Sequence, residues 1–533
     1  MAYAQHIQRQ NNTSASEIPT NRKSEMYKSN SGAALFKIDD WAFLRRCLIT
    51  GTSSNSYYAG KFQMTEDFER VVISCAKEDA IRTADMIREV SHEALAVKVD
   101  SCIFALLILS TVSPSEFLRI ANDVIRTQSH FHLFMSFVKG GKGESSGYRG
   151  MGKTIQTFGK NWFENKPPSW LAFQALKYPQ RNGFKVRDEL RLFHPNPKGD
   201  EVRDNLFGYI VEKPLPSENF EGLEIIKAYE WLKSDPTPAN AIKAIQDHKL
   251  SFEMVAPLGC MNDKVWNQLF QTMPVGATLR NLGNLSTHNV FDDKNNCSLL
   301  RTRLTTKENL KKARVHPYDI LVANKIYRQG GGKMSRKTWT VKNHVSNTLD
   351  IALETSFDSL DSTGQTYFFA IDVSHSMTSP IANGIVNCAE VATTMALASA
   401  KAEEDCYIYG FKHILTDLHI TSRDTFSAAL TKASRQNFGS TNAGSVYEYA
   451  IKNNLYVDTF AFFTDCESFG GQQAFQLLNK YRKAVNPNAR AVYCALEPYW
   501  GSLADPKDAG SLTVEGFDPT AVKLIQQFSL GKM

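Results

Sequence analysis

The spacing of apolar residues changes near residue 364, and the new pattern narrowly limits the fold of everything after it. From there, short apolar runs of strand character alternate with longer segments of helical character. The predicted strands lie in TYFFAIDVS, CYIYGFK, TFAFFTDCE and ARAVYCALE, and the predicted helices include GIVNCAEVATTMALASAKAEE, SVYEYAIKNN and QQAFQLLNKYRKAV. Strands that alternate with helices build parallel βαβ units. Residues 364–533 are therefore predicted to form an α/β domain with a doubly wound sheet.

Residues from about 35 to 345 have mainly helical patterns, and strand patterns are sparse there. The segment VWNQLFQTM shows the helical spacing through Val265, Trp266, Leu269, Phe270 and Met273. Many helices over three hundred residues favour stacked helix pairs rather than one core. We predict a disordered polar tail at 1–31, an all-α domain at 32–363 and the α/β domain at 364–533. The segment SNTLDIALETSFDSLDSTG between the two domains is either a linker or a last docking helix.

Charge is distributed unevenly along the 533 residues, whose net charge is +6. The stretch from Gly364 to Met533 holds 13 basic and 16 acidic residues, whereas the rest of the chain holds 48 basic and 39 acidic residues. A polyanionic partner is therefore expected to bind the helical part.

Two further features concern the cellular setting. The sequence contains no run of about 18 apolar residues, and its first residues are polar, so neither a membrane span nor a secretory signal is expected. The nine cysteines are scattered, without a CxxC pair or a Cys/His metal spacing. Free thiols in a reducing compartment are the simplest interpretation, and we expect a cytoplasmic protein.

A set of oxygen-bearing side chains follows the predicted strands of the α/β domain. Asp372, Ser374 and Ser376 alternate directly after the apolar run YFFAI, Thr441 lies in the glycine-rich GSTNAG, and Asp465 follows a later strand. Ligand sites of α/β sheets lie at the carboxyl ends of the strands. Hard divalent cations prefer oxygen ligands, so the set predicts a site for a divalent metal, with Mg²⁺ as the leading candidate. The alternative is that the serines cap turns and that Asp372 caps the next helix.

The stretch KYPQRNGFKVRDELRLFH, residues 177–194, is rich in basic residues. On a helix beyond Gly183, Arg187, Arg191 and His194 share one face through their i, i+4, i+7 spacing. Val186, Leu190 and Phe193 have the same spacing on a neighbouring face that can be buried. Lys177 and Arg181 lie just upstream, where Pro179 argues against a continuous helix. Such a stripe can neutralise phosphates, although a solvated helix face explains it equally.

Other basic segments support a nucleic-acid partner without distinguishing RNA from DNA. Arg149 and Lys153 lie in the glycine-rich YRGMGK, KENLKKARVHPYDI contains Lys311, Lys312, Arg314 and His316, and RQGGGKMSRK is a basic loop. The letters GYRGMGKT also match a phosphate-binding P-loop from Gly147 to Thr154. That motif requires a preceding strand, and no strand pattern precedes it here.

Several of these stretches resemble a known family. The Asp372, Ser374, Ser376, Thr441 and Asp465 set resembles the metal-ion-dependent adhesion site of von Willebrand factor A domains. With LRRCLITGTSSNSYYAGK, the 177–194 stretch, VWNQLFQTMPVGATLRNLGNL, KKARVHPYDILVA, FFTDCESFGG and the C-terminal LADPKDAGSLTVEGFDPTAVKLIQQFSL, the chain resembles the Ro ribonucleoprotein autoantigen family. Its N-terminal module is called the TROVE domain.

The resemblance implies a fold, partners and roles for particular residues. The implied fold is a ring of HEAT-like helical repeats closed by the A domain. The implied partners are small noncoding Y RNAs on the outer surface and single-stranded 3′ ends of misfolded RNAs in the basic hole. Lys177, Arg181 and His194 match positions implicated in Y RNA binding, and the metal-site carboxylates would act largely through waters.

The leading functional hypothesis is a noncatalytic RNA-binding protein, monomeric within a ribonucleoprotein, that acts in RNA quality control and stability. The sequence shows no nucleophile–base pair that would argue for catalysis. The alternative is a metal-dependent protein-interaction scaffold, in which a partner supplies an acidic residue to the metal. A weaker third hypothesis is a nucleotide-dependent enzyme that uses Lys153 and Thr154.

Overall fold

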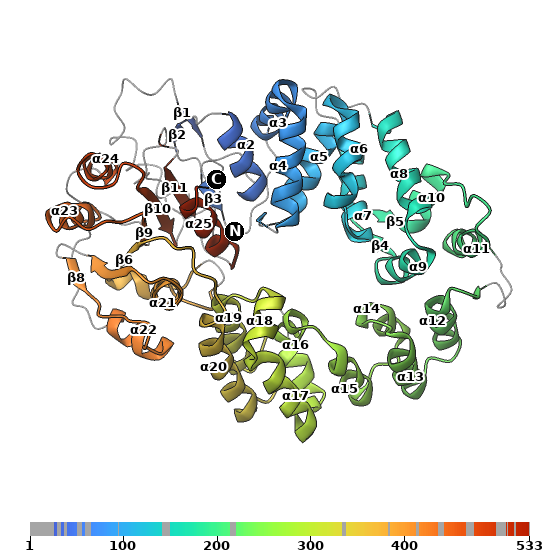
Figure 1. Cartoon of the computed structure of the whole chain (residues 1–533). Helices are drawn as coiled ribbons and strands as arrows, with labels where there is room; N and C mark the ends of the chain where they lie inside the picture. The colour runs from blue at the N-terminus through green and yellow to red at the C-terminus, as the bar shows by residue number, and fades with distance from the viewer. Residues whose placement is uncertain are drawn as a thin grey trace. The chain divides into compact units, whose positions relative to one another are not determined.

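Figure 1 shows the computed structural model of the chain. It describes residues 26–28, 34–36, 40–50, 56–58, 66–93, 95–96, 98–140, 150–213, 220–332, 337–381, 384–411, 415–434, 442–464, 474–496, 508, 510–515 and 519–531. The chain divides into two compact units, one formed by Met1–Phe68 with Ser298–Met533 and the other by Glu69–Cys297. The boundaries of these units differ from those of the predicted domains. Helices from the beginning and from the end of the predicted all-α domain belong to the same unit as the α/β part.

The first unit contains the predicted parallel sheet. Within the described residues, seven strands pair in the order β3-β11-β10-β9-β6-β7-β8. All pair in parallel except the edge strand β8, which is antiparallel to β7. The strands are β3 (Ser56–Tyr58), β6 (Tyr367–Asp372), β7 (Cys406–Phe411), β8 (Leu415–Asp417), β9 (Thr459–Thr464), β10 (Arg490–Ala495) and β11 (Ser511–Glu515). The doubly wound α/β prediction is confirmed.

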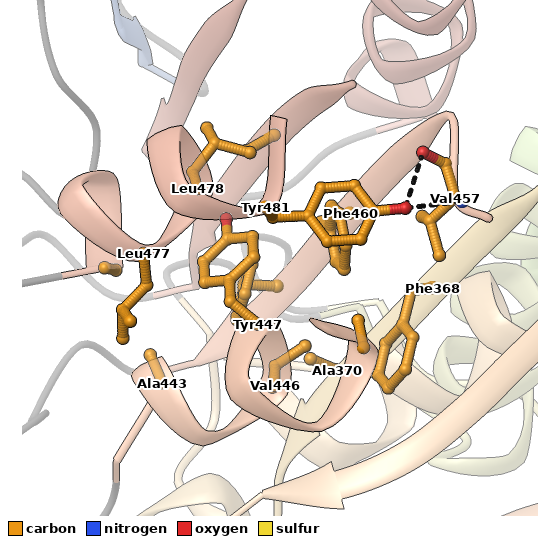
Figure 2. Close-up of a cluster of buried hydrophobic side chains, with 14 of the residues drawn as sticks. Phe368, Ala370, Ala443, Val446, Tyr447, Val457, Phe460, Leu477, Leu478 and Tyr481 are labelled. Atoms are coloured by element: carbon orange, nitrogen blue, oxygen red, sulfur yellow. Dashed lines mark hydrogen bonds between the residues drawn. The ribbon is translucent and has the colours of Figure 1, made fainter. Parts of the chain in front are cut away.

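Helices cover both faces of this sheet, because successive strand residues point to opposite sides. They are α21 (Cys388–Ala402), α22 (Phe426–Ser434), α23 (Gly444–Lys452), α24 (Ala474–Ala484) and α25 (Pro519–Ser529). Figure 2 shows one of the two cores, in which Phe368 and Phe460 pack with Tyr447 and Tyr481. The buried Tyr481 hydroxyl accepts a hydrogen bond from the Val457 amide at 2.8 Å. The central strands are consequently apolar over most of their length, with polar residues such as Asp372 and Thr464 at their ends.

Helices of the predicted all-α domain pack with this α/β part inside the same unit. They are α2 (Asp40–Thr50), α18 (Lys307–Ala313), α19 (Pro317–Arg328) and α20 (Asn343–Phe357). Lys325 on α19 forms an ion pair with Glu390 on α21, and Glu354 on α20 accepts a hydrogen bond from the Phe426 amide at 2.9 Å. The segment that was predicted as either a linker or a docking helix therefore contains a docking helix.

The connection into the first strand of the α/β part is fixed by one carboxylate. Glu403, which follows α21, accepts hydrogen bonds of 2.7–3.1 Å from the Thr363 and Gly364 amides and from the Ser362 and Thr363 hydroxyls. These bonds hold the chain just before β6, which ends at the predicted metal site.

The second unit is helical, as predicted. Its helices are α4 (Ala80–His92), α5 (Asp100–Val112), α6 (Pro114–Val124), α7 (Gln128–Gly140), α8 (Lys153–Asn165), α9 (Pro168–Lys177), α10 (Val186–Phe193), α11 (Glu201–Ile210), α12 (Glu224–Ser234), α13 (Pro238–His248), α14 (Phe252–Val255), α15 (Asp263–Thr272) and α16 (Val275–Thr287). Helix α3 (Glu66–Glu78) and helix α17 (Lys294–Thr305) cross the boundaries between the units.

Most of the predicted polar tail falls outside this description. Residues 1–25 of the predicted tail lie outside the described residues, and Met26–Lys28 forms strand β1, which pairs with β2 (Ala34–Phe36). The most apolar run, CIFALLIL, belongs to the buried helix α5. Throughout the part of the chain that the structure describes, every helix is too short or too polar to span a bilayer.

Candidate nucleic-acid interface and metal site

A short β-hairpin connects α9 to α10 and carries Arg181. Its strands are β4 (Gln180–Arg181) and β5 (Phe184–Lys185), and the turn residues Asn182 and Gly183 have φ angles of 52° and 80°. Two positive φ angles define the type I′ turn that Asn-Gly favours. We did not predict this hairpin from the sequence, although Asn-Gly is a strong signal for it. The exposed Arg181 donates to the Ser129 hydroxyl on α7 at 3.1 Å, which fixes the hairpin on that helix.

Helix α10 has the amphipathic arrangement that the sequence predicted. Val186, Leu190 and Phe193 are buried, with at most 4% of each side chain exposed. Arg191 and His194 are exposed and Arg187 is partly exposed. His194 ends the helix in the left-handed region at φ 46°, and its amide donates to the Leu190 carbonyl at 3.1 Å. The helix therefore anchors its apolar face and presents the basic face to solvent.

The cations of this surface differ in how far nearby acids neutralise them. Arg187 bonds to Glu212 at 2.8 Å and to Asp188 at 3.4 Å, so its charge is compensated. Arg191 donates to the Val211 carbonyl at 3.2 Å, which leaves its charge uncompensated.

Lys177, Arg181 and His194 differ from Arg187 in their contacts. Lys177 lies over the rings of Phe173 and Tyr178, at 5.6 and 5.5 Å from their centroids. Among the described residues, no carboxylate bonds to Lys177, Arg181 or His194.

Two further cations that we did not single out adjoin the hairpin. Lys139 on α7 lies 5.8 Å from the centroid of the Phe184 ring, and Lys185 on β5 is exposed. Burial, together with the charges of the nearby Arg126 and Arg181, lowers the pKa of His130 on α7 to about 4. We use the name hairpin surface for Lys139, Lys177, Arg181, Lys185, Arg191 and His194.

Two other basic candidates belong to the glycine-rich YRGMGK stretch. Lys153 is the first residue of that helix and is exposed, whereas Arg149 lies outside the described residues. The described element before the P-loop-like letters is the helix α7 rather than a strand. The strand–loop–helix context that a P-loop requires is therefore not found in the described part of this region.

A buried polar network, which we did not predict from the sequence, lies beneath the hairpin surface. Glu189 on α10 and His132 on α7 are both fully buried, and His132 Nδ1 lies 2.8 Å from Glu189 Oε1. Gln128 Nε2 donates to Glu189 Oε2 at 2.5 Å, and His132 Nε2 lies 2.9 Å from the Tyr178 carbonyl. One network thus ties α7 to α10 and to the end of α9, which carry most of the hairpin surface.

The geometry of this network determines the position of one proton and limits a second proton to one contact. A carbonyl oxygen only accepts hydrogen bonds, so His132 Nε2 carries a proton that it donates to Tyr178. The contact between Nδ1 and Glu189 then requires one shared proton, held on either atom. Burial raises the pKa of Glu189 from its usual 4.5 to about 7, while the bonds to His132 and Gln128 lower it less strongly. A buried carboxyl group of this kind stays protonated at pH values at which an exposed glutamate is already ionised.

The predicted metal site lies where β6 and β9 end side by side. Asp372 is the last residue of β6 and is buried. Its Oδ1 accepts a hydrogen bond from the Ser374 amide at 2.9 Å, and its Oδ2 accepts one from the Thr464 hydroxyl, at the end of β9, at 2.8 Å. After β6 the chain continues to β7, which lies on one side of β6, and later returns to β9, which lies on the other side. The order of the strands therefore reverses between β6 and β9, and such a topological switch point is where ligands bind to α/β sheets.

Three of the five predicted ligands lie among the described residues and fit a Mg²⁺ ion. The Ser374 and Ser376 hydroxyl oxygens lie 2.9 Å apart. Adjacent ligands of an octahedral Mg²⁺, at about 2.0–2.1 Å from the ion, are separated by about 2.9 Å. Both oxygens of Asp372 bond to protein donors, which suits a carboxylate that contacts the ion through water. Thr441 and Asp465 lie outside the described residues, although Asp465 directly follows Thr464.

Comparison with known proteins identifies the family. Residues 366–529 match the family described as the Ro60 vWA domain, and residues 247–354 match the TROVE domain. The two matched domains are those of the Ro family. Two Ro relatives are each named RNA-binding protein RO60. The one from Caenorhabditis elegans is 27% identical over 589 residues, covering 96% of this chain and 91% of the relative. The one from Deinococcus radiodurans is 28% identical over 516 residues, covering 95% and 96%.

A solved structure of the Ro family agrees with the fold. The crystal structure of the Deinococcus radiodurans RO (RSR) protein matches with a TM-score of 0.83 and 28% sequence identity. The match covers 93% of this chain and all of that chain. The helical part followed by an A domain is thus the architecture of this Ro chain.

Proposed function

We propose that this protein binds RNA through the hairpin surface. Its partners are small noncoding RNAs of the Y type and the 3′ ends of misfolded noncoding RNAs. In this role the protein is noncatalytic, works as a monomer within a cytoplasmic ribonucleoprotein, and serves RNA quality control and stability. The names of the two relatives support RNA as the ligand.

One observation carries the proposal more than any other. Lys177, Arg181 and His194 come from the end of α9, the hairpin and the end of α10, and no described carboxylate neutralises them. Phosphate oxygens would supply the missing negative charge.

The test replaces these three side chains and measures the binding of a structured RNA. Lys177→Gln, Arg181→Gln and His194→Asn are combined, because asparagine tolerates the left-handed conformation of position 194. We expect weaker binding and a slope of log affinity against log salt that is smaller by up to about 3, near one unit for each lost phosphate contact.

A matched control removes three cations elsewhere in the same unit. Arg88→Gln, Lys264→Gln and Lys294→Gln remove three formal positive charges at other exposed positions, one more than Lys177→Gln and Arg181→Gln remove. This control should retain the wild-type affinity and salt slope. Equal binding by the two triple variants would reject the hairpin surface as the binding site.

We also propose that the A domain holds a divalent cation, Mg²⁺ being the leading candidate, and that it binds a partner protein through an acidic side chain. The converging hydroxyls of Ser374 and Ser376 support this second function. Asp372, Ser374, Ser376, Thr441 and Asp465 would hold the ion. A ligand set with three hydroxyls and two carboxylates leaves the ion electrophilic enough to take a carboxylate at an open position.

Isothermal calorimetry with MgCl₂ tests the metal site directly. Asp372→Ala should abolish the binding of the ion, whereas Asp417→Ala, at the end of the edge strand β8, should leave it unchanged. Full retention of Mg²⁺ binding by Asp372→Ala would exclude the site.

A further inference from the structure

Helix α12 exposes an aromatic side chain in basic surroundings. Trp231 is 40% exposed, which makes it the most exposed tryptophan of the described chain. The core side of α12 is formed by other residues, including Ala228 and Leu232, so the indole is not required for that core. Its position on the solvent side therefore calls for another explanation.

Two lysines flank this indole. Lys227 precedes Trp231 by four residues and lies on the same face of α12. Lys243 on the neighbouring helix α13 places its ammonium group 5.9 Å from the centroid of the indole. In the described part of the chain neither lysine has a carboxylate partner, in contrast to Lys233, which pairs with Glu230 at 3.2 Å.

We propose that Lys227, Trp231 and Lys243 form a contact for single-stranded RNA, separate from the hairpin surface. An unpaired base stacks on the indole, and the phosphates on either side of that base meet the two ammonium groups. Stacking on aromatic side chains combined with cations along the backbone is how single strands are bound without sequence preference. This inference rests on the proposed function and assigns the single-stranded part of the ligand to α12 and α13.

The surroundings of Trp231 favour a nucleobase over a protein partner. Among the described residues of α12 and α13, Trp231 is the only large apolar side chain that is exposed. Protein interfaces are centred on larger apolar patches, whereas a single base offers one flat ring next to a negative phosphate. An isolated indole between two cations matches the second geometry.

Binding of a labelled oligouridylate of about 12 nucleotides, followed by fluorescence anisotropy at fixed salt, tests the contact. Trp231→Ala should weaken binding roughly tenfold, in the range found for one lost stacking contact. Trp231→Phe should restore most of the affinity, because phenylalanine still offers a ring. Tyr456→Ala is the control, since Tyr456 is 56% exposed but lies beside Asp458. Unchanged oligouridylate binding by Trp231→Ala would overturn the proposal.

A second binding assay with a structured RNA distinguishes an error in this proposal from an error in the proposed RNA-binding function. With a hairpin RNA that lacks a single-stranded end, Trp231→Ala should bind like the wild type, while the Lys177, Arg181 and His194 triple variant should bind weakly. An equal loss on both RNAs for Trp231→Ala would show a structural role and overturn the contact. A wild-type protein that binds neither RNA would instead reject the proposed function.

Discussion

The buried pair of His132 and Glu189 makes the stability of the region under the hairpin surface dependent on pH, and Glu189→Gln should remove that dependence. In the variant, His132 keeps its bond to the Tyr178 carbonyl and accepts a hydrogen bond at Nδ1 from the new amide. The amide oxygen accepts the bond that Gln128 now donates to Glu189. The network is thus preserved without a titrating carboxyl group, and the variant should fold.

The magnitude follows from the pKa of the buried carboxyl group. Burial raises this pKa from 4.5 to about 7 in the folded protein. The folded state therefore binds more protons than the unfolded state between these values, so stability is full below pH 4.5 and falls as the pH rises through about 7. At 1.36 kcal/mol per pKa unit, the loss amounts to about 3 kcal/mol. The side chain is fully buried, so solvent screening does not reduce this value substantially.

Amide hydrogen exchange of peptides from α7 and α10 measures the effect locally. After correction for intrinsic exchange rates, the opening free energy of the wild type minus that of Glu189→Gln should fall by about 3 kcal/mol from pH 4.5 to pH 8. A difference that stays constant over this range would refute the reasoning. A difference that grows with pH would show instead that Glu189 is ionised and stabilised by a charged His132.

Three further substitutions test the packing and the metal site. Gly159→Ala places a Cβ atom 2.1 Å from the buried ring of Phe193, so overpacking of about 1–3 kcal/mol should exceed the helix-propensity gain of about 1 kcal/mol and lower the thermal unfolding temperature. Gly183→Ala strains the hairpin turn at φ +80° and should weaken structured-RNA binding in a filter assay, while an unchanged affinity would show that the turn is not required. Thr464→Val removes the hydroxyl that bonds Asp372 and should reduce Mg²⁺ affinity in calorimetry, whereas wild-type affinity would argue against this support.

Periodicity in the sequence predicted those parts of the fold in which one face of an element is buried. The spacing of Val186, Leu190 and Phe193 placed the basic face of α10 correctly, because burial of three apolar residues fixes the rotation of a short helix. The alternation of strands and helices likewise predicted that Asp372 and the end of β9 lie together where the parallel strands have their carboxyl ends. Neighbouring parallel strands bring their carboxyl ends together whatever the intervening sequence is.

Contacts between distant segments were not predictable from such patterns. Glu189 has the character of a surface residue in a helix full of charges, and its buried partner His132 is 57 residues away. Strand β3 contains only three residues, and it pairs with Thr513–Glu515 more than 450 positions later in the chain. Neither the buried pair nor the short strand has a recognisable local sequence pattern, because each is stabilised by residues far away in the chain.

Ultraviolet crosslinking of the protein to its RNA in native cells, followed by mass spectrometry of the crosslinked peptides, tests the central claim most directly. If the hairpin surface is the RNA-binding site, crosslinks should occur in the peptides that span 177–194. These crosslinks should be lost in the Lys177, Arg181 and His194 triple variant. Crosslinks confined to residues 364–533, or unchanged in the triple variant, would contradict it.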